Sequence, residues 1–529
     1  MIKRLQFIVA CLFASMLMDI TPVQGQFTDE GFKFIKLFSL IESRYVDSVD
    51  LNKLSDEMIR DMLHKLDPHS VYITKDEVEA MNEPLAGNFE GIGVTFDILN
   101  DTIIVISPIV GGPSEKLGIR AGDRIIKIAD ENVAGTGITT KQVLAKLKGK
   151  KGTVVKVDIK RRGVNALISF DIVRDKIPIH SVDAAYKVSS NTGYIRLSRF
   201  SATTLTEVNE ALEGLKKDGI TDIILDLSGN GGGYLDVAVS LSDAFLEANK
   251  LIVYTLGSHA PKKEYISTSK GIFESGKLAI IIDEGSASAS EIVAGAIQDW
   301  DRGIIIGRRS FGKGLVQYPF AFPDGSIIRL TVARYYTPTG RLIQKPYTEG
   351  YEEYSEELNK RFTHGELLSK DSIHFTGSLK YFTLVRKREV FGGGGIMPDI
   401  FVPFDTLSYN DYYQGMINKG IVNDFALIYV DKNRENLRGK YPEFEQFKNK
   451  FEIDSLMLKD LITYANQKSL PYKAVDFGQS KHLVTIILKA SIARDLWSSS
   501  EFYEIFNSAE AGFNKAVEVF DNWDSYFSK

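Results

Sequence analysis

Cysteine is almost missing from this chain, since Cys11 is the only one among 529 residues. Histidine is also sparse, and none of the seven histidines occurs at a metal-ligand spacing such as HExxH. The G-x-S-x-G elbow that presents a serine nucleophile in an α/β-hydrolase does not occur either. These absences disfavour a metal centre and a Ser-His-Asp hydrolase.

The numbers of positively and negatively charged residues are nearly equal. The net charge is -5, charged residues make up 25% of the chain, and hydrophobic residues make up 44%. This balance describes an ordinary globular protein, and it gives no support for binding to nucleic acid. The length exceeds what one hydrophobic core fills, so roughly 150 residues per domain predicts about three or four units.

An apolar run at the N-terminus is typical of a secretory signal peptide. Lys3 and Arg4 precede the run Phe7–Met18, and small residues close the region at Gly25. The run is shorter than the roughly 20 residues that span a bilayer. We therefore predict that residues 1–25 are removed and that the protein is exported to the periplasm. The mature chain would then hold no cysteine, which excludes disulfides and thiolate chemistry.

Cys11 leaves a second interpretation of the N-terminus open. The segment Ile8–Cys11 loosely resembles a lipoprotein processing site, so the alternative is a lipid anchor on Cys11. Cleavage there would leave a hydrophobic mature start over Leu12–Met18, which favours the signal peptide.

Residues 26–87 carry a helical pattern. Apolar residues at three-to-four spacing indicate an amphipathic helix, and a second such run covers 54–66. The apolar residues of the first helix are Phe34, Leu37, Phe38, Ile41 and Tyr45. The turn Leu66–Ser70 follows, in which we interpret His69 as structural.

Residues 88–175 change to short strands with two short helices between them, which predicts a small domain of its own. The order resembles a PDZ domain. In such a domain, N–H groups of a glycine-containing loop hold a terminal carboxylate, and the next strand pairs with an extended peptide. The candidate residues for binding the C-terminal tail of a protein are Gly91, Ile92, Gly93 and Val94. Considered alone, the two glycines could be ordinary turn residues.

The pattern over residues 176–405 predicts that this segment forms the main α/β core. Mostly apolar runs over 221–227, 278–283 and 303–307 alternate with helical patterns over 201–217, 234–248 and 287–300. Repeated alternation of this kind favours a mainly parallel sheet whose strands are buried on both faces. Residues 347–390 are polar, which predicts an irregular insertion within this core.

The pattern over residues 406–529 predicts a helical region rich in aromatic residues, and no catalytic or ligand-binding motif is visible in it.

Ser288 and Lys313 are the candidate nucleophile and base. Ser288 follows a predicted buried strand and begins a helix, where ligands collect in open α/β sheets. A serine hydroxyl needs an adjacent base, and an amine serves if desolvation keeps it uncharged. The structural alternative is that Ser288 simply caps the helix.

Lys313 lies in a glycine-rich turn, Gly307–Gly314, that also matches most of a phosphate-binding P-loop. The match fails at Gly314, where a P-loop has Ser or Thr, and the next residues predict a strand rather than a helix. Nucleotide binding is therefore disfavoured. A solvated structural lysine is the other alternative.

The run Asp226–Gly233 closes another strand with three consecutive glycines. Such a turn can aim N–H groups at a developing oxyanion, a contribution of roughly 3 kcal/mol per donor. The Ala289 N–H, next to the nucleophile, could supply the second donor. Taken singly, a glycine run is more often a flexible turn.

Together these segments resemble the carboxyl-terminal processing protease family, over roughly residues 30–405. The motifs in family order are LDPHSVYI at 66–73, the PDZ-like region, DLSGNGGG at 226–233, GSASASEI at 285–292, FGKGLVQ at 311–317, YYTPTGRLIQ at 335–344 and GGIMPDI at 394–400. The resemblance implies that Ser288 is the nucleophile, Lys313 the general base and Gln317 a partner that orients the lysine. It places the oxyanion hole at Gly232 or Gly233 together with Ala289.

The same resemblance implies a multidomain α+β protein, in which an α/β protease core of crotonase-like fold carries an inserted PDZ domain between helical N- and C-terminal regions. Asp299 matches an acidic position of the family that we interpret as structural. Ser228 and Gly231 stand where the family often has Arg and Pro, which could alter the oxyanion turn.

The resulting hypothesis is an exported serine endopeptidase that needs no cofactor and acts on proteins with accessible, apolar C-terminal tails. A non-catalytic PDZ scaffold of the cell envelope is the alternative, and the intact Ser288, Lys313 and Gln317 argue against it. An acyl-CoA enzyme is a third interpretation, which export and the tail-binding domain disfavour. Homo-oligomerisation and association with the envelope membrane are left open.

Overall fold

The computed structural model describes residues 28–269, 271–374 and 379–527. The predicted signal peptide and Cys11 lie outside these residues. The chain divides into two units, 1–66 and 67–529.

The described part of the first unit consists of two helices. Helix α2 (Asp29–Arg44) begins where the Thr28 hydroxyl accepts a hydrogen bond from the Gly31 N–H, and α3 (Leu51–His64) is capped by the Asp50 carboxylate. Both helices lie in the region for which the sequence predicts helices. No side chain of α2 is buried.

The second unit begins with a short strand and a helix. Strand β1 (Val71–Ile73) follows the LDPHS turn, and α4 (Lys75–Ala86) ends at Gly87, whose φ of 72° is the left-handed conformation that glycine adopts readily. The antiparallel pair β2 (Asn88–Gly91) and β9 (Asp175–Pro178) then frames the PDZ-like region.

The PDZ-like region is an antiparallel sheet with its own apolar core. The strand order is β3 (Val94–Leu99), β4 (Thr102–Pro108), β5 (Arg124–Ile128), β7 (Val154–Lys160) and β8 (Ile168–Val173), with β6 (Glu131–Asn132) beside β5. Its helices are α5 (Pro113–Lys116) and α6 (Thr140–Leu147). Ile103, Ile125 and Val157 are fully buried between the sheet and α6 residues such as Val143. Alternating apolar residues on β7 therefore face this core, as its sequence pattern predicts.

A six-stranded sheet forms the centre of the protease-like region. Its strand order is β10 (Val182–Lys187), β11 (Thr192–Leu197), β12 (Asp222–Asp226), β15 (Leu278–Ile282), β16 (Ile304–Gly307) and β21 (Ile400–Phe401). Every pair from β11 to β21 is parallel, and β10 is antiparallel to β11. The prediction of a mainly parallel sheet is confirmed.

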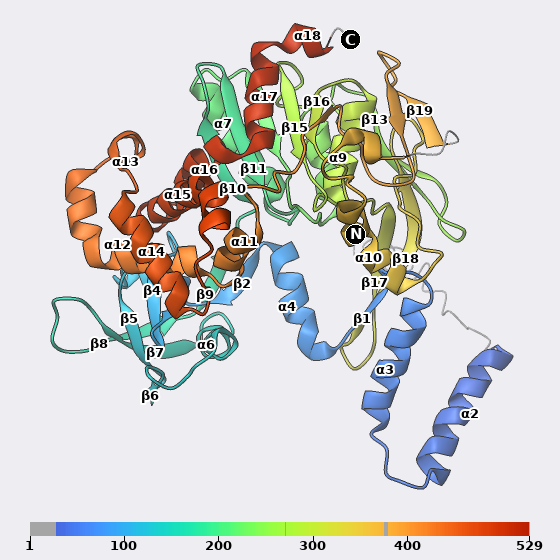
Figure 1. The fold of residues 1–529 in the computed structure, drawn as a ribbon. Helices are drawn as coiled ribbons and strands as arrows, with labels where there is room; N and C mark the ends of the chain where they lie inside the picture. The colour runs from blue at the N-terminus through green and yellow to red at the C-terminus, as the bar shows by residue number, and fades with distance from the viewer. Residues whose placement is uncertain (1–27, 270, 375–378, 528–529) are drawn as a thin grey trace, which may run out of the picture. The chain divides into compact units, whose positions relative to one another are not determined.

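Both faces of this sheet are covered. Helices α7 (Thr204–Lys217), α8 (Leu235–Asp243) and α9 (Ala289–Asp299) share one apolar core with it. Helix α17 (Ala511–Asp521), near the C-terminus, packs Val519 and Phe520 on the other face, and Figure 1 shows it alongside β15. Burial on both faces explains why β12 and β15 are continuous apolar runs.

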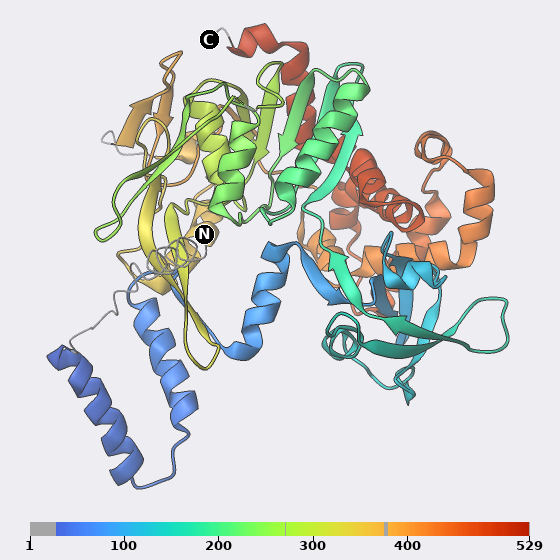
Figure 2. The same ribbon diagram turned by 180° about the vertical axis from the view of Figure 1, so that it is seen from behind.

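A second, antiparallel sheet packs beside the first. It consists of β14 (Lys263–Ile266), β13 (Leu251–Leu256), β18 (Ile327–Tyr336) and β1, with β17 (Leu315–Ala321) also paired to β18. Figure 2 shows β17 and β18 from behind, in yellow. The pairing of β1 with β18 brings the LDPHS turn next to the segment that follows Lys313.

In its described residues, the insertion over 347–390 is only partly irregular, which corrects the sequence prediction in part. It contains α10 (Tyr351–Thr363), a 3-10 turn (Lys370–Ser372) and the hairpin β19 (Lys380–Phe382) and β20 (Glu389–Phe391). Helix α10 is stabilised by buried charges rather than by an apolar stripe. Arg361 is buried, pairs with Glu357 one turn earlier and donates to the carbonyls of Ser310 and Phe311.

The chain ends in a helical region, as predicted. The helices are α11 (Asp411–Asn418), α12 (Ile421–Lys440), α13 (Phe444–Lys450), α14 (Ser455–Gln467), α15 (Ala474–Leu496), α16 (Ser499–Phe506), a 3-10 turn (Asn507–Ala509), α17 and α18 (Trp523–Phe527). Helices α11 to α16 enclose a core of their own around Met416, Val430 and Phe447. Across the described residues, no helix has both the length and the apolar character that a membrane crossing needs.

Candidate active site

Ser288 lies at the junction between strand β15 and helix α9, as the sequence predicts. It is half-buried and has a φ of 55° and a ψ of -110°. A residue other than glycine rarely holds such a backbone conformation, and strain of this kind collects at functional sites. The structural observation therefore goes beyond a simple helix cap.

Lys313 lies in the loop after β16, the neighbour of β15 in the sheet. The Ser288 and Lys313 loops thus leave the carboxyl ends of adjacent parallel strands, where an open α/β sheet binds its ligands. The residues after Lys313 form strand β17 rather than a helix. This contradicts the P-loop alternative, because a P-loop opens a helix.

Glu291 joins the two loops. Its fully buried carboxylate accepts hydrogen bonds from the backbone N–H groups of Ser288 (2.9 Å), Gly312 (2.7 Å) and Lys313 (2.8 Å), and from the Ser310 hydroxyl (2.5 Å). Burial raises the pKa of Glu291, and the four donors oppose that effect. One side chain therefore holds the backbone of both candidate residues.

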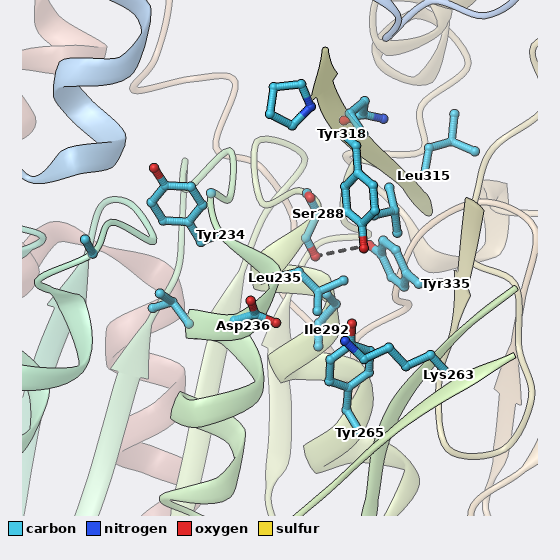
Figure 3. Close-up of a pocket in the computed structure, with 16 residues that line it drawn as sticks. Tyr234, Leu235, Asp236, Lys263, Tyr265, Ser288, Ile292, Leu315, Tyr318 and Tyr335 are labelled. Atoms are coloured by element: carbon cyan, nitrogen blue, oxygen red, sulfur yellow. Dashed lines mark hydrogen bonds between the residues drawn. The ribbon is translucent and has the colours of Figure 1, made fainter. Parts of the chain in front are cut away.

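Tyr335 makes a second link between the same residues. Its buried hydroxyl lies 3.1 Å from the Ser288 carbonyl oxygen and also within hydrogen-bond reach of the Lys313 carbonyl oxygen. Figure 3 shows the Tyr335 ring below Ser288 with the first of these contacts dashed. Burial raises the pKa of Tyr335 far above its usual range, so it stays a neutral hydrogen-bond donor.

Burial lowers the pKa of Lys313 from its ordinary value of 10.5. The nearby cation Arg329 also lowers it, whereas the carboxylates of Glu291 and Asp67 raise it. Desolvation is the largest of these effects, so the environment favours the neutral amine. A neutral amine is the form that can take a proton from a serine hydroxyl.

The glycine run lies directly against Ser288. Gly232 has a φ of 99°, and a Cβ at this position would come within 2.9 Å of the Ser288 Cβ and 3.0 Å of the Ala289 nitrogen. The Gly232 N–H donates to Asn230 Oδ1 at 2.9 Å. Within the described ranges, the N–H groups of Gly233 and Ala289 have no acceptor. The fold thus brings the three predicted oxyanion-hole residues together.

Gln317 lies on β17 and lines the same cavity as Ser288. Its Nε2 donates to Thr331 Oγ1 across the strand pair at 3.3 Å.

A cavity of about 490 Å³ opens beside Ser288. Ile292, Leu315 and Tyr335 give it an apolar wall, and Asp236 and Lys263 bring opposite charges to it, as Figure 3 shows. Its size is within the range of pockets that bind small molecules or a short peptide segment.

The sequence analysis interprets His69 and Asp299 as structural residues, and both make specific contacts in the fold. His69 is half-buried, and its Nε2 is 2.7 Å from the Tyr354 hydroxyl; burial and the neighbouring Lys313 lower its pKa to about 3. Asp299 and Arg341 form a fully buried ion pair at 2.5 Å, and Asp299 also accepts from the Thr339 N–H. Asp299 therefore anchors the YYTPTGR segment to α9.

The PDZ-like loop Gly91–Val94 is held in place through its carbonyl groups. Gly93 has a φ of 74°, and its carbonyl accepts from the Ile109 N–H, while the Ile92 carbonyl accepts from the N–H and hydroxyl of Ser114. Strand β3 after the loop is hydrogen-bonded to β4, and no second strand of the described chain pairs with it. Its outer edge can therefore pair with an extended peptide.

The sequence analysis missed Glu291 and Tyr335. A signal for Glu291 exists, because a Ser followed three residues later by a Glu is a capping box. Tyr335 is the first residue of the YYTPTGRLIQ motif, to which the sequence analysis assigned no role. Among the described residues, no group of three or more His, Cys, Asp or Glu could hold a metal ion.

Comparison with protein families supports this architecture. The model for peptidase family S41 matches residues 191–351, and a PDZ domain model matches 104–161. The model for the activating protease CtpB N-terminal domain matches 18–77, and a family of unknown function (DUF8443) matches 412–498.

Related proteins extend the match. The carboxy-terminal-processing protease of Bartonella bacilliformis is 35% identical over 392 residues, which cover 70% of this chain and 89% of that protein. The carboxy-terminal processing protease CtpA of Bacillus subtilis is 36% identical, over 59% of this chain and 66% of the relative. The chain thus spans about two thirds of the CtpA length.

Solved structures are similar over parts of the chain. The photosystem II D1 C-terminal processing protease is 29% identical over 59% of this chain and 90% of its own, with a TM-score of 0.33. A PDZ domain of a carboxy-terminal protease from Vibrio cholerae, solved with a peptide, is 33% identical over 17% of this chain and 97% of its own, with a TM-score of 0.16.

This chain belongs to the carboxy-terminal processing protease family. It has the S41 protease fold with an inserted PDZ domain and helical regions at both ends.

Proposed function

We propose that this protein is an exported endopeptidase that works through a Ser288–Lys313 dyad. The observation that carries the proposal is the Glu291 carboxylate, which accepts hydrogen bonds from the N–H groups of both residues and so holds their loops together. The lowered pKa of Lys313 supports its role as a base.

The proposed reaction has two stages. Ser288 Oγ attacks the scissile carbonyl carbon while its proton passes to Lys313 Nζ, and the oxyanion accepts hydrogen bonds from the N–H groups of Ala289 and of the glycine turn. The C–N bond then breaks, and the leaving amine takes the proton from Lys313. Water then attacks the acyl ester as Lys313 takes one of its protons. The ester C–O bond breaks, Lys313 returns that proton to Ser288 Oγ, and the carboxylic acid product leaves.

Of the two candidate glycines, Gly233 is the better oxyanion donor. The Gly232 N–H already donates to Asn230 Oδ1, whereas the Gly233 N–H is not engaged within the described chain. Engagement of Gly232 with a substrate oxygen would have to break that bond first. Gly233 with Ala289 therefore forms the pair that we assign.

The PDZ domain is proposed to capture the C-terminal tail of the substrate. The Gly91–Val94 loop would hold the terminal carboxylate, and β3 would pair with the last residues of an apolar tail. The apolar wall of the cavity beside Ser288 supports the choice of apolar substrate segments. Export to the periplasm is proposed from the predicted signal peptide, with the lipid anchor at Cys11 as the alternative.

The test is degradation of a folded protein that ends in an apolar tail, compared with the same protein whose tail is amidated or charged. We expect the parent enzyme to cleave the first far faster than the others, and Ser288→Ala and Lys313→Ala to abolish cleavage. Tail binding by the parent without cleavage of any substrate would instead favour the non-catalytic scaffold.

The pH profile gives a second check. Lys313 acts only when neutral, so kcat/KM should fall as the pH drops through the lowered pKa of Lys313. A profile that stays flat down to about pH 5 would contradict a lysine base, because the amine would be protonated there.

A further inference from the structure

The turn Asp67–Ser70, at the start of the second unit, is hydrogen-bonded to β18, the strand that faces Gln317. Asp67 is 7% exposed, and its Oδ1 accepts from the N–H groups of His69 and Ser70, both at 2.8 Å. Its Oδ2 accepts from the Ser70 hydroxyl at 2.6 Å. These hydrogen bonds hold the buried Asp67 carboxylate in one position within the turn.

Thr331 on β18 is held by this turn at two points. Its N–H donates to Ser70 Oγ at 3.0 Å, and its hydroxyl donates to Asp67 Oδ1 at 3.0 Å. An ionised carboxylate can only accept, so the single hydrogen of the Thr331 hydroxyl is committed to Asp67. Thr331 Oγ1 can then only accept from any further partner.

Gln317 is that partner. The register between β17 and β18 shifts after Val316, which faces Ala333, so that Gln317 faces Thr331 and Val332 is passed over. Such a bulge redirects a side chain, and a cross-strand pair lies close enough to interact. Nε2 of Gln317 reaches Thr331 Oγ1 at 3.3 Å.

The direction of these bonds fixes the orientation of the Gln317 amide. Its nitrogen and oxygen are otherwise interchangeable, and the hydrogen-bond network decides which way the group lies. Since Thr331 offers only an acceptor, the amide must turn its NH2 to Thr331 and leave Oε1 on the other side. An acceptor oxygen is what a lysine base needs as an orienting partner, since an ammonium or amine donates.

We propose that Asp67 and Thr331 are positioning residues that orient Gln317 so that its Oε1 can accept from Lys313. This inference rests on the proposed function, because it takes Lys313 as the base. It assigns a role to Asp67 of the LDPHS motif, which is bonded to Thr331.

Thr331→Val is the main test, because it removes the hydroxyl and keeps the branched shape. We expect kcat to fall by about 10-fold with KM changed by less than about 2-fold, since Thr331 itself does not line the cavity and the substitution disorients a hydrogen-bond acceptor of Lys313. Thr331→Ser keeps the hydroxyl and should recover most of the lost kcat. Thermal melts of both variants establish that they are folded.

A double-mutant cycle separates positioning from packing. In a Gln317→Ala background there is no amide to orient, so Thr331→Val should cost less than about 2-fold further in kcat. A full 10-fold loss in that background would overturn the proposal, as would an unchanged kcat in Thr331→Val itself.

The outcomes also distinguish this inference from the proposed function. If Ser288→Ala or Lys313→Ala retains turnover, the dyad is wrong and the positioning argument fails with it. If both abolish turnover while the Thr331 and Gln317 effects are simply additive, the dyad stands and only the role of Asp67 and Thr331 is overturned.

Discussion

The protease core and the C-terminal helical region differ in what they bury. Glu291, Asp299 and Arg341 are fully buried in the core, near the ends of its strands and helices. The C-terminal helices instead bury aromatic and aliphatic side chains around Phe447, with Asp495 a nearly buried carboxylate. Burial of a charge is costly unless it is paired, so a region that concentrates such groups is a place to look for chemistry. By this criterion the core is the region in which we place the proposed site.

The largest effect on stability should come from the C-terminal core. Phe447 is fully buried and stacks on Phe451 with ring centroids 4.5 Å apart. Phe447→Ala should lower the free energy of unfolding by about 3–5 kcal/mol through the cavity that it leaves. Urea unfolding followed by tryptophan fluorescence measures this, and kcat of the folded variant at low temperature should be unchanged. A parallel loss of kcat would show that the C-terminal region acts on the site.

Glu291→Gln should be the next largest effect, and it should appear in activity. A glutamine has one acceptor oxygen, so its NH2 must face either the N–H groups of Ser288 and Lys313 or the N–H group of Gly312, and the four-donor site is broken in both orientations. We expect kcat/KM to fall by about 100-fold, or nearly 3 kcal/mol.

Glu284→Gln is a matched control for that experiment. Glu284 pairs with Arg308 at 2.7 Å, and so also connects the loops after β15 and β16, but it bonds to neither Ser288 nor Lys313. It should change kcat/KM by less than about 3-fold. Equal losses in the two variants would mean that general loop tethering matters rather than the bonds of Glu291.

Lys313→Met should abolish turnover and raise stability by about 1 kcal/mol at neutral pH, since it removes a desolvated amine. The sign follows from the pKa of Lys313, which is lower in the folded chain than its ordinary 10.5. Between these two values the unfolded chain binds more protons, so the free energy of unfolding of the parent should rise with pH. Thermal melts at pH 7 and pH 9.5 should show this slope in the parent, and a smaller slope in Lys313→Met.

The smallest effect should come from the contact between the PDZ domain and the C-terminal region. Arg124 of β5 and Asp431 of α12 form a partly exposed ion pair at 2.7 Å. A double-mutant cycle with Arg124→Ala and Asp431→Ala should give a coupling energy of about 0.5 kcal/mol in urea unfolding. A coupling above about 2 kcal/mol would mean that the two regions depend on each other far more than their separate cores suggest.

The sequence predicts those strands of the core that are determined by their own residues and their immediate neighbours in the chain. Apolar runs bounded by glycine mark β12, β15 and β16, because strands buried on both faces need no polar alternation. Ser288 and the glycine turn follow the ends of β15 and β12, which local patterns mark, whereas Lys313 lies in the glycine-rich loop between β16 and β17.

The features that the sequence analysis missed depend on contacts between segments that are distant in the sequence. Helix α10 was missed because its stabilising partners, the carbonyls of Ser310 and Phe311, lie about 50 residues away in the sequence. The link from Asp67 through Thr331 to Gln317 has no local pattern either. A polar residue in a strand looks exposed until the partner that buries it is known.

The bond between Asp67 and Thr331 spans 264 residues of sequence. Contacts of such long separation form late, because the chain must first close a large loop. A chain still emerging from the ribosome has not made this contact or the β1–β18 pairing around it. In the mechanism that we propose, Gln317 is therefore oriented only when the folding of the second unit is nearly finished, so proteolytic activity should appear late in folding.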